Sequence, residues 1–178
     1  MAWVIRRAST DDAAGLAAAG AILFCQAYQG AIDARDLAAY VAEAFTETTM
    51  RAELCDPGIV TLVAWDGGDV AGFAQLRKRN VPVDDSPPAN VELSRIYLER
   101  RYHGTGLAQQ LLSEAGVVAR SLGANGVWLS VWERNRRAIA FYEKHGFRRV
   151  GHQDFRMAGD LHCDMIMAAS AERLWHAL

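Results

Sequence analysis

The sequence is poor in cysteine and proline and has no surplus of charge of one sign. Its 178 residues include three cysteines and four prolines, and 19 Lys and Arg against 21 Asp and Glu give a net charge of −2. Cys25, Cys55 and Cys163 form no C-x-x-C pair, which argues against a disulfide framework or a structural zinc site. The charge balance argues against a nucleic-acid partner. Any polyanionic ligand must therefore be bound by a local arrangement of groups.

Long apolar runs are also missing, so we expect no membrane-spanning helix and no membrane partner. The first ten residues lack the apolar segment of a signal peptide, which predicts a cytoplasmic protein. Apolar residues nevertheless make up 51% of the chain, enough for a buried core. At this length we expect one domain that spans residues 1–178.

The hydrophobic pattern predicts alternating strands and helices. An α/β fold follows, with a central mixed and mostly antiparallel sheet of six to seven strands and about four flanking helices. The strands are expected at 3–7, 59–65, 70–77, 91–98, 127–132, 147–155 and 162–168, and the helices at 12–28, 33–54, 106–122 and 136–145.

A glycine-containing turn lies between the expected strand 91–98 and the helix 106–122. It reads Arg101-Tyr102-His103-Gly104-Thr105-Gly106. Glycines let a backbone approach a ligand closely, and the first turn of a helix presents unpaired N–H groups and the positive end of its dipole. Such a turn can cradle a pyrophosphate group without any net positive charge.

Several interpretations of this turn compete. A dinucleotide-binding turn would need a third glycine where the chain has Gln109, and no P-loop string G-x-x-x-x-G-K-[ST] occurs. The third ligand-binding interpretation is R-x-x-G-x-G, the pyrophosphate loop of acetyl-CoA-dependent N-acetyltransferases. An ordinary strand-to-helix turn is the structural alternative, because two glycines alone are a weak signal.

A second motif follows about thirty residues later. The segment NRRAIAFYEKHGF, residues 135–147, matches the pattern N-x-x-A-x-x-F-Y-x-x-x-G-F that closes the cofactor site of the same enzymes. With both motifs in order, the sequence resembles the GCN5-related N-acetyltransferase (GNAT) superfamily over about residues 59–168. Within that superfamily its motif segments look most like bacterial enzymes that acetylate polyamines or other small amines.

The resemblance implies an enzyme that moves an acetyl group from acetyl-CoA directly to a primary amine of a polyamine-like small molecule or of a peptide. It implies Glu92 as the base that deprotonates the amine and Tyr142 as the acid that protonates the sulfur of coenzyme A. A tyrosine hydroxyl can donate at neutral pH. No triad partner supports Cys163 as a nucleophile, and we expect no metal.

The cofactor residues implied by the resemblance lie on three elements. Ile96 and Leu98 would act through their backbone groups. Asn135 is interpreted equally as a helix cap and as a pantetheine contact, and Lys144 equally as a 3′-phosphate contact and as a solvated charge. The full set is Ile96, Leu98, Arg101, His103, Gly104, Thr105, Gly106, Leu107, Ala108, Asn135, Ala138 and Lys144.

The acceptor site is expected between the two N-terminal helices and the last hairpin. Those helices carry acidic residues that suit a cationic acceptor, although a solvated helix face explains them as well: Asp33, Asp36, Glu43, Glu47, Glu53 and Asp56. A homodimer is one possible assembly of this chain. Two roles are open for the C-terminal apolar residues, which could form the dimer interface or cap the core: Leu174, Trp175 and Leu178. The alternative function is a non-catalytic acyl-CoA-binding sensor or interaction module on the same fold.

Overall fold

The computed structural model describes residues 3–30, 32–84, 89–157 and 160–170. The chain divides into two compact units. Unit 1 comprises 1–75 and 95–111, and unit 2 comprises 76–94 and 112–178. The expected interface residues Leu174, Trp175 and Leu178 lie outside the described residues.

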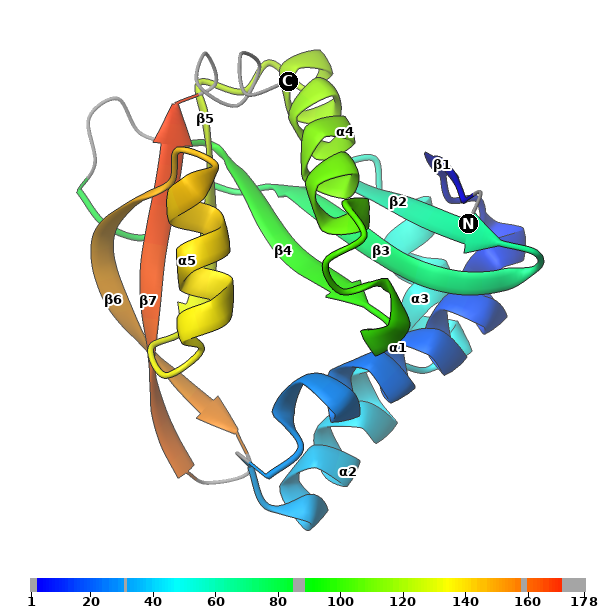
Figure 1. The fold of residues 1–178 in the computed structure, drawn as a ribbon. Coiled ribbons are helices and arrows are strands. Elements are labelled where there is room, and N and C mark those ends of the chain that lie inside the picture. The colour runs from blue at the N-terminus through cyan, green and yellow to red at the C-terminus, as the bar shows by residue number, and fades with distance from the viewer. Residues whose placement is uncertain (1–2, 31, 85–88, 158–159, 171–178) are drawn as a thin grey trace. The chain divides into compact units, whose positions relative to one another are not determined.

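Seven strands form one sheet in the described part of the chain, with the order β1-β2-β3-β4-β5-β7-β6. The pairings are mixed and mostly antiparallel, and β4 with β5 is a parallel pair. This confirms the predicted α/β architecture. The strands are β1 (Val4–Arg7), β2 (Ile59–Asp66), β3 (Asp69–Lys78), β4 (Val91–Leu98), β5 (Gly126–Trp132), β6 (Arg148–Met157) and β7 (Asp160–Ser170) (Figure 1).

The described residues contain five α-helices, one more than the sequence analysis predicted. These are α1 (Ala13–Tyr28), α2 (Ala34–Ala44), α3 (Glu47–Cys55), α4 (Leu107–Ser121) and α5 (Arg136–Lys144). None of them is long and apolar enough to cross a membrane.

The extra helix arises because the predicted helix 33–54 is interrupted. Phe45 leaves the helical conformation and its side chain is buried, while Thr46 caps a new helix by accepting a hydrogen bond from the Thr49 N–H at 3.0 Å. The apolar spacing stops at Phe45 and resumes only at Met50, and the polar residues 46–49 between them hold the cap of the new helix. The cap satisfies an N–H that the first turn of α3 would otherwise leave unpaired.

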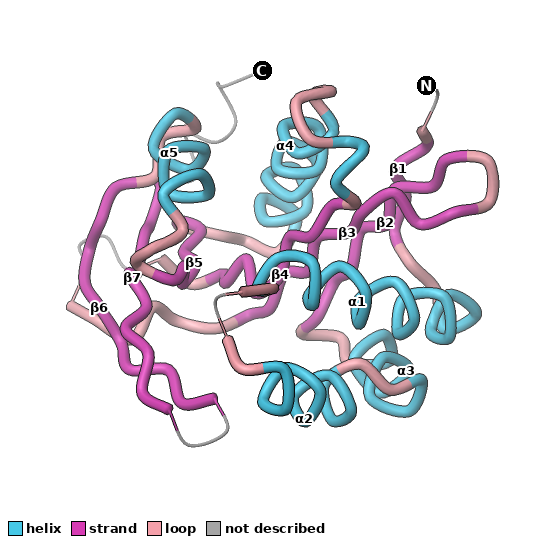
Figure 2. Tube along the Cα trace, turned by 60° about the horizontal axis from the view of Figure 1, so that its bottom comes forward, coloured by secondary structure: helices cyan, strands magenta, loops and turns pink. Residues whose placement is uncertain are grey.

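In unit 1, helices α1, α2 and α3 lie together on one side of strands β1, β2 and β3 (Figure 2). Aromatic side chains join the helices to the sheet. The Phe24 ring of α1 stacks on Tyr40 of α2 at 4.6 Å between centroids and meets Tyr97 of β4 edge-on at 6.0 Å. These contacts fix the face of β4 that carries Tyr97 against the helices.

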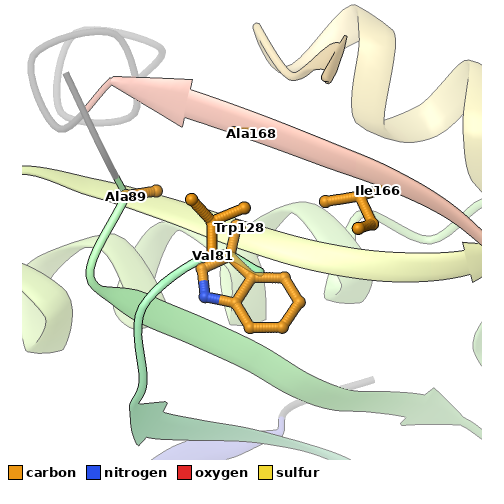
Figure 3. Packing of buried hydrophobic residues seen from close by; sticks show 5 residues of the cluster. All are labelled: Val81, Ala89, Trp128, Ile166 and Ala168. Atoms are coloured by element: carbon orange, nitrogen blue, oxygen red, sulfur yellow. The ribbon is translucent and has the colours of Figure 1, made fainter. Parts of the chain in front are cut away.

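In unit 2, β5 pairs with β7 over seven residue pairs, and β7 forms a long hairpin with β6. Trp128 of β5 is fully buried at the centre of this unit. It packs with the side chains labelled beside it in Figure 3, which are Val81, Ala89, Ile166 and Ala168. A tryptophan buried so completely is a large apolar contribution to stability.

Candidate active site

The glycine turn of unit 1 has the geometry of an anion-binding loop. Gly104 and Gly106 have φ of 79° and 95°, and a Cβ at either position would meet nothing within 4 Å. Gly106 precedes α4, and its carbonyl accepts the Gln110 N–H at 3.0 Å. The space beside both glycines is therefore open, and the first turn of α4 follows directly, an arrangement that an oxygen-rich anion can use.

Tyr102 fixes this turn to the β2–β3 hairpin. Its buried hydroxyl donates to Oδ2 of Asp66 at 2.8 Å, and burial together with this bond raises the pKa of Tyr102. Thr105 in turn donates to the Tyr102 carbonyl through its hydroxyl at 2.7 Å. Sequence reasoning missed both Tyr102 and Asp66, because nothing local signals a bond between residues on separate elements.

The charged residues beside the turn have protein partners. The Arg101 guanidinium contacts Glu99 at 2.8 Å and Asp69 at 3.6 Å, and it lies 4.9 Å from the centre of the Tyr102 ring. His103 is exposed. The phosphate contacts expected of Arg101 and His103 stay predictions.

In unit 2, the parallel ladder between β4 and β5 is short. It consists of two residue pairs, Val91 with Val127 and Glu92 with Trp128, although β4 continues to Leu98. The resemblance implies that these strands separate so that the backbone of β4 can pair with the pantetheine arm. A ladder that stops at Glu92 fits that requirement, and Ile96 and Leu98 lie on β4 after its end.

Glu92 is a buried carboxylate with one ionic partner in the described structure. The residue is 8% exposed, and its Oε2 lies 3.4 Å from Nη1 of Arg79. The Arg79 guanidinium also lies 5.7 Å from the centre of the Trp128 ring. Sequence reasoning missed Arg79, which follows β3 and is separated from Glu92 by the proline-rich loop.

Helix α5 carries the other predicted residues of unit 2. The side chain of Asn135 accepts from the Ala138 N–H at 3.1 Å, so the capping role is confirmed, and the pantetheine contact stays a prediction. Tyr142 is 7% exposed, with its ring edge-on to Phe147 at 5.6 Å. Lys144 is exposed in the last turn. The structure thus gives Tyr142 a fixed and largely buried ring.

Cys163 on β7 is a free cysteine with an unfavourable setting for a nucleophile. Desolvation raises the pKa of its thiol, and the carboxylates of Glu133, Asp154 and Asp164 raise it further. A thiol is reactive as its thiolate, which these surroundings disfavour. Across the described residues, no group of three or more His, Cys, Asp or Glu side chains could hold a metal ion.

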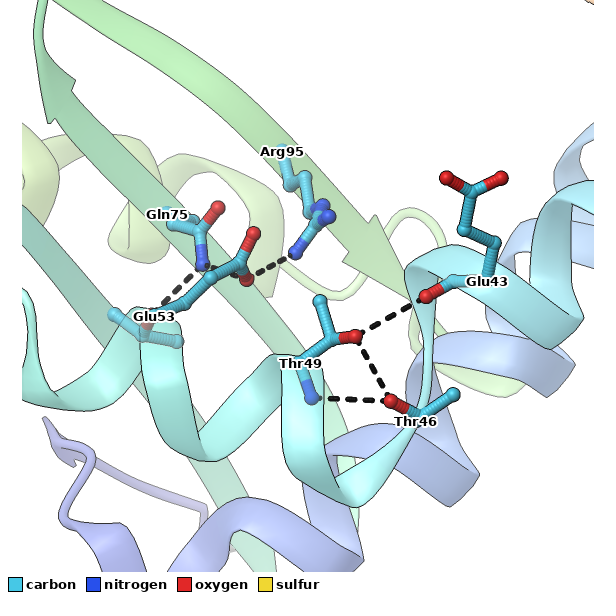
Figure 4. Close-up of polar contacts among 7 residues, drawn as sticks. Glu43, Thr46, Thr49, Glu53, Gln75 and Arg95 are labelled. Atoms are coloured by element: carbon cyan, nitrogen blue, oxygen red, sulfur yellow. Dashed lines mark hydrogen bonds and ion pairs between the residues drawn. The ribbon is translucent and has the colours of Figure 1, made fainter.

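Several acidic residues of the N-terminal helices are engaged within unit 1. Glu53 forms an ion pair with Arg95 of β4 at 2.7 Å and accepts from the Gln75 amide at 3.0 Å (Figure 4). Glu47 pairs with Arg51. Asp33 caps α2, and Asp56 accepts the Gly58 N–H. Four of the six expected acceptor-binding acids therefore have partners within the protein.

Comparison with known proteins identifies the family. The model of the acetyltransferase (GNAT) family matches residues 25–147. An uncharacterized N-acetyltransferase of Mycobacterium tuberculosis (strain H37Rv) is 35% identical over 156 residues, which cover 88% of this chain and 96% of that protein. The spermine/spermidine N(1)-acetyltransferase of Bacillus subtilis is 32% identical over 89 residues, which cover 49% of this chain and 59% of that protein.

Among solved structures, the PaiA N-acetyltransferase of Thermoplasma acidophilum in complex with coenzyme A has the same fold. The TM-score is 0.77 at 22% identity, with 96% of this chain and 99% of that chain covered. The family model spans more than half of the chain and the mycobacterial relative nearly all of it, so this chain belongs to the GNAT family and is an acetyl-CoA-dependent N-acetyltransferase.

Proposed function

We propose that the chain transfers the acetyl group of acetyl-CoA directly to a primary amine of a small molecule, polyamine-like, or of a peptide, with Glu92 as base and Tyr142 as acid. The single observation that carries this proposal is the setting of Glu92. It is a buried carboxylate at the last residue pair of the β4–β5 ladder.

The reaction needs proton transfers around one exchange of bonds. The amine nitrogen attacks the thioester carbon, so that a C–N bond forms and the C–S bond breaks. Before the attack, the ammonium gives one proton to the Glu92 carboxylate, directly or through one water molecule. The departing sulfur takes a proton from the Tyr142 hydroxyl. The second proton that the nitrogen loses on forming the amide replaces the one that Tyr142 gives to the sulfur. No acyl-enzyme is formed, in keeping with the raised pKa of Cys163.

Each unit separately carries candidate contacts to coenzyme A. Within unit 1, the candidates are the N–H groups of Gly104, Gly106, Leu107 and Ala108 and the backbone of Ile96 and Leu98. Thr105 is a candidate as well, although its own N–H donates to the Tyr102 carbonyl at 3.3 Å. Within unit 2, the candidates are Asn135, Ala138 and Lys144 of α5. The open space over both glycines supports this assignment, since a phosphate can approach the backbone there.

Polyamine-like acceptors are supported by the similarity to the Bacillus enzyme over half of this chain and by the acids Asp36 and Glu43 of α2. Family membership favours an enzyme over the alternative of a non-catalytic sensor.

The test is a panel of amines incubated with the protein and acetyl-CoA, with release of the free coenzyme A thiol as the readout. The panel contains spermidine, spermine, single amino acids, their amides and short peptides. We expect saturable thiol release with at least one primary amine and the mono-acetylated product by mass spectrometry. Absence of release above the rate of hydrolysis with every amine would reject the proposal.

A further inference from the structure

We propose that Arg79 selects the acceptor by binding its carboxylate, so that amines carrying a carboxylate one or two carbons away, such as amino acids, are preferred to polyamines. The inference rests on the proposed function, because it takes Glu92 as the group that receives the ammonium proton. It keeps the proposed reaction and its base, and it replaces polyamine-like acceptors by carboxylate-bearing amines at that same site.

A positive charge lies directly beside the base. Nη1 of Arg79 lies 3.4 Å from Oε2 of Glu92, and in the described structure this is the one ion pair that either residue makes. An ammonium brought to Glu92 must therefore approach within a few ångströms of a guanidinium. Arginine keeps its charge throughout the physiological pH range, so the second charge is always present.

The guanidinium of Arg79 has hydrogen-bond donors that its contact with Glu92 does not use. A guanidinium carries five N–H donors, and its contact with Glu92 uses one of them at a long distance. The Arg79 side chain is 62% exposed, so its remaining donors face solvent. Two neighbouring N–H groups of a guanidinium match the two oxygens of a carboxylate. Arg79 can thus bind a carboxylate while it stays beside Glu92.

The backbone of Arg79 is held by its surroundings. Its carbonyl accepts from Nε1 of the buried Trp128 at 2.7 Å, and its N–H donates to the carbonyl of Asn90 at 3.2 Å. The guanidinium lies over the indole ring, 5.7 Å from its centre. The two hydrogen bonds fix the backbone from which the side chain extends, and the indole ring and Glu92 are the groups that the guanidinium contacts.

An acceptor with both charges satisfies both residues at once. In an amino acid the ammonium can face Glu92 while the carboxylate faces Arg79, and the opposite charges are separated by one carbon. A polyamine brings further positive charge to the same place, and like charges in a partly buried site repel strongly. The Arg79–Glu92 pair therefore attracts the two charges of an amino acid, and Arg79 repels the additional positive charges of a polyamine.

The experiment compares each amino acid with its own amide, because the pair shares the amine and differs in the carboxylate. For the wild-type protein we expect kcat/KM to be at least about tenfold higher for the amino acid than for the amide or for spermidine, a factor within reach of one charge-assisted pair. Equal values, or a preference for the amide or for spermidine, would overturn the inference. This comparison needs no variant.

The variants then test whether Arg79 is responsible. Arg79→Gln should abolish the preference for the amino acid, and Arg79→Lys should restore part of it, since lysine keeps the charge without the paired donors. Lys78→Gln is the matched control. Lys78 is exposed and adjacent to Arg79 in the sequence, and its substitution removes the same single positive charge. A preference that survives in Arg79→Gln, or that falls equally in Lys78→Gln, would reject the role of Arg79.

The experiment distinguishes a wrong acceptor preference from a wrong reaction. Turnover of polyamines or amides without turnover of any carboxylate-bearing amine would overturn the role of Arg79 and leave the acetyltransferase reaction intact. Absence of turnover with the whole panel would reject the proposed function itself, and the inference with it.

Discussion

The hydroxyl of Tyr102 donates a hydrogen bond of 2.8 Å to the carboxylate of Asp66, and this contact fastens the glycine turn to the β2–β3 hairpin. The ring is 1% exposed and meets Trp3 edge-on at 6.1 Å. Since the two glycines of the turn carry no side chains that could position it, its backbone depends on this anchor. Coenzyme A binding should depend on it as well.

Tyr102→Phe removes one hydroxyl and leaves the ring in place. We expect the KM for acetyl-CoA to rise about fivefold with kcat nearly unchanged, because a hydrogen bond to a charged group contributes roughly 1.5–3 kcal/mol and only part of that reaches the turn. Steady-state kinetics at saturating amine would measure both constants.

Two substitutions in the hairpin serve as controls. Asp66→Asn keeps an acceptor oxygen and should have a smaller effect than Asp66→Ala. Asp69→Asn removes an exposed carboxylate 3.6 Å from Arg101 and should leave the KM close to that of the wild type. A fall in kcat with an unchanged KM would contradict a positioning role for Tyr102.

Gly106→Ala tests the cradle itself. A φ of 95° strains any residue with a Cβ, by roughly 1–3 kcal/mol, and the added Cβ points into the space expected to hold the pyrophosphate. We expect a lower Tm and an affinity for acetyl-CoA reduced by at least about tenfold, measured by calorimetry.

Gly123→Ala is the matched control for Gly106→Ala. Gly123 follows the other end of α4 with a φ of 75°, and a Cβ there also meets nothing within 4 Å. It should lower the Tm by a similar amount without changing the affinity for acetyl-CoA. Equal losses of affinity in both variants would mean that strain alone, and no contact with the cofactor, explains the result.

Sequence patterns predicted the elements around the cofactor motifs well. The strand expected at 91–98 is β4, and the helices expected at 106–122 and 136–145 are α4 and α5 within two residues at each end. Their limits are encoded locally, by glycines at the turns and by the Asn135 cap. The break at Phe45 was not predicted, because the prediction rested on the apolar spacing up to Phe45 and did not weigh the polar residues 46–49, where Thr46 caps the next helix.

The contacts that position the site were less predictable. Tyr102 and Asp66 are 36 residues apart in the sequence, and Arg79 and Glu92 are 13 apart. No periodicity within one element encodes such a bond, because it depends on how two elements meet. The acidic residues of the N-terminal helices show the same thing. The sequence suggests an exposed carboxylate at Glu53, whereas in the structure Glu53 forms a largely buried ion pair with Arg95.

Glu92→Gln tests the base. The amide is nearly the same size as the carboxylate and cannot accept the proton of the amine. We expect kcat to fall about a hundredfold, in the range typical of a lost general base, while the affinity for acetyl-CoA stays the same. The pH dependence of kcat/KM should also change. Unaltered turnover and an unaltered pH profile would assign the base to another group.

Tyr142→Phe tests the acid. The ring is packed against Phe147 and Phe141, so the variant keeps its shape and loses only the hydroxyl. We expect kcat to fall at least about tenfold and the dissociation constant of acetyl-CoA to change by less than about threefold. An affinity that falls as much as kcat would instead make Tyr142 a binding residue.

Asp12 should make stability depend on pH in the acid range. Arg6 contacts both carboxylate oxygens at 2.7 Å, and its hydrogen bonds, assisted by the N–H of Ser9, hold the pKa of Asp12 at about 2, below its ordinary value of 3.8. The unfolded chain therefore takes up this proton at a higher pH than the folded protein does. The stabilisation by Asp12 is complete above about pH 4 and is lost as the pH falls toward 2.

The measurement is the free energy of unfolding in urea at a series of pH values, for the wild type and for Asp12→Asn. Other carboxylates titrate in the same range, so the difference between the two proteins isolates Asp12. That difference should be constant above about pH 4 and should shrink steadily between pH 4 and pH 2, because protonation makes the wild-type side chain as neutral as asparagine. Two parallel curves would mean that the Arg6–Asp12 pair does not set the pKa of this carboxylate.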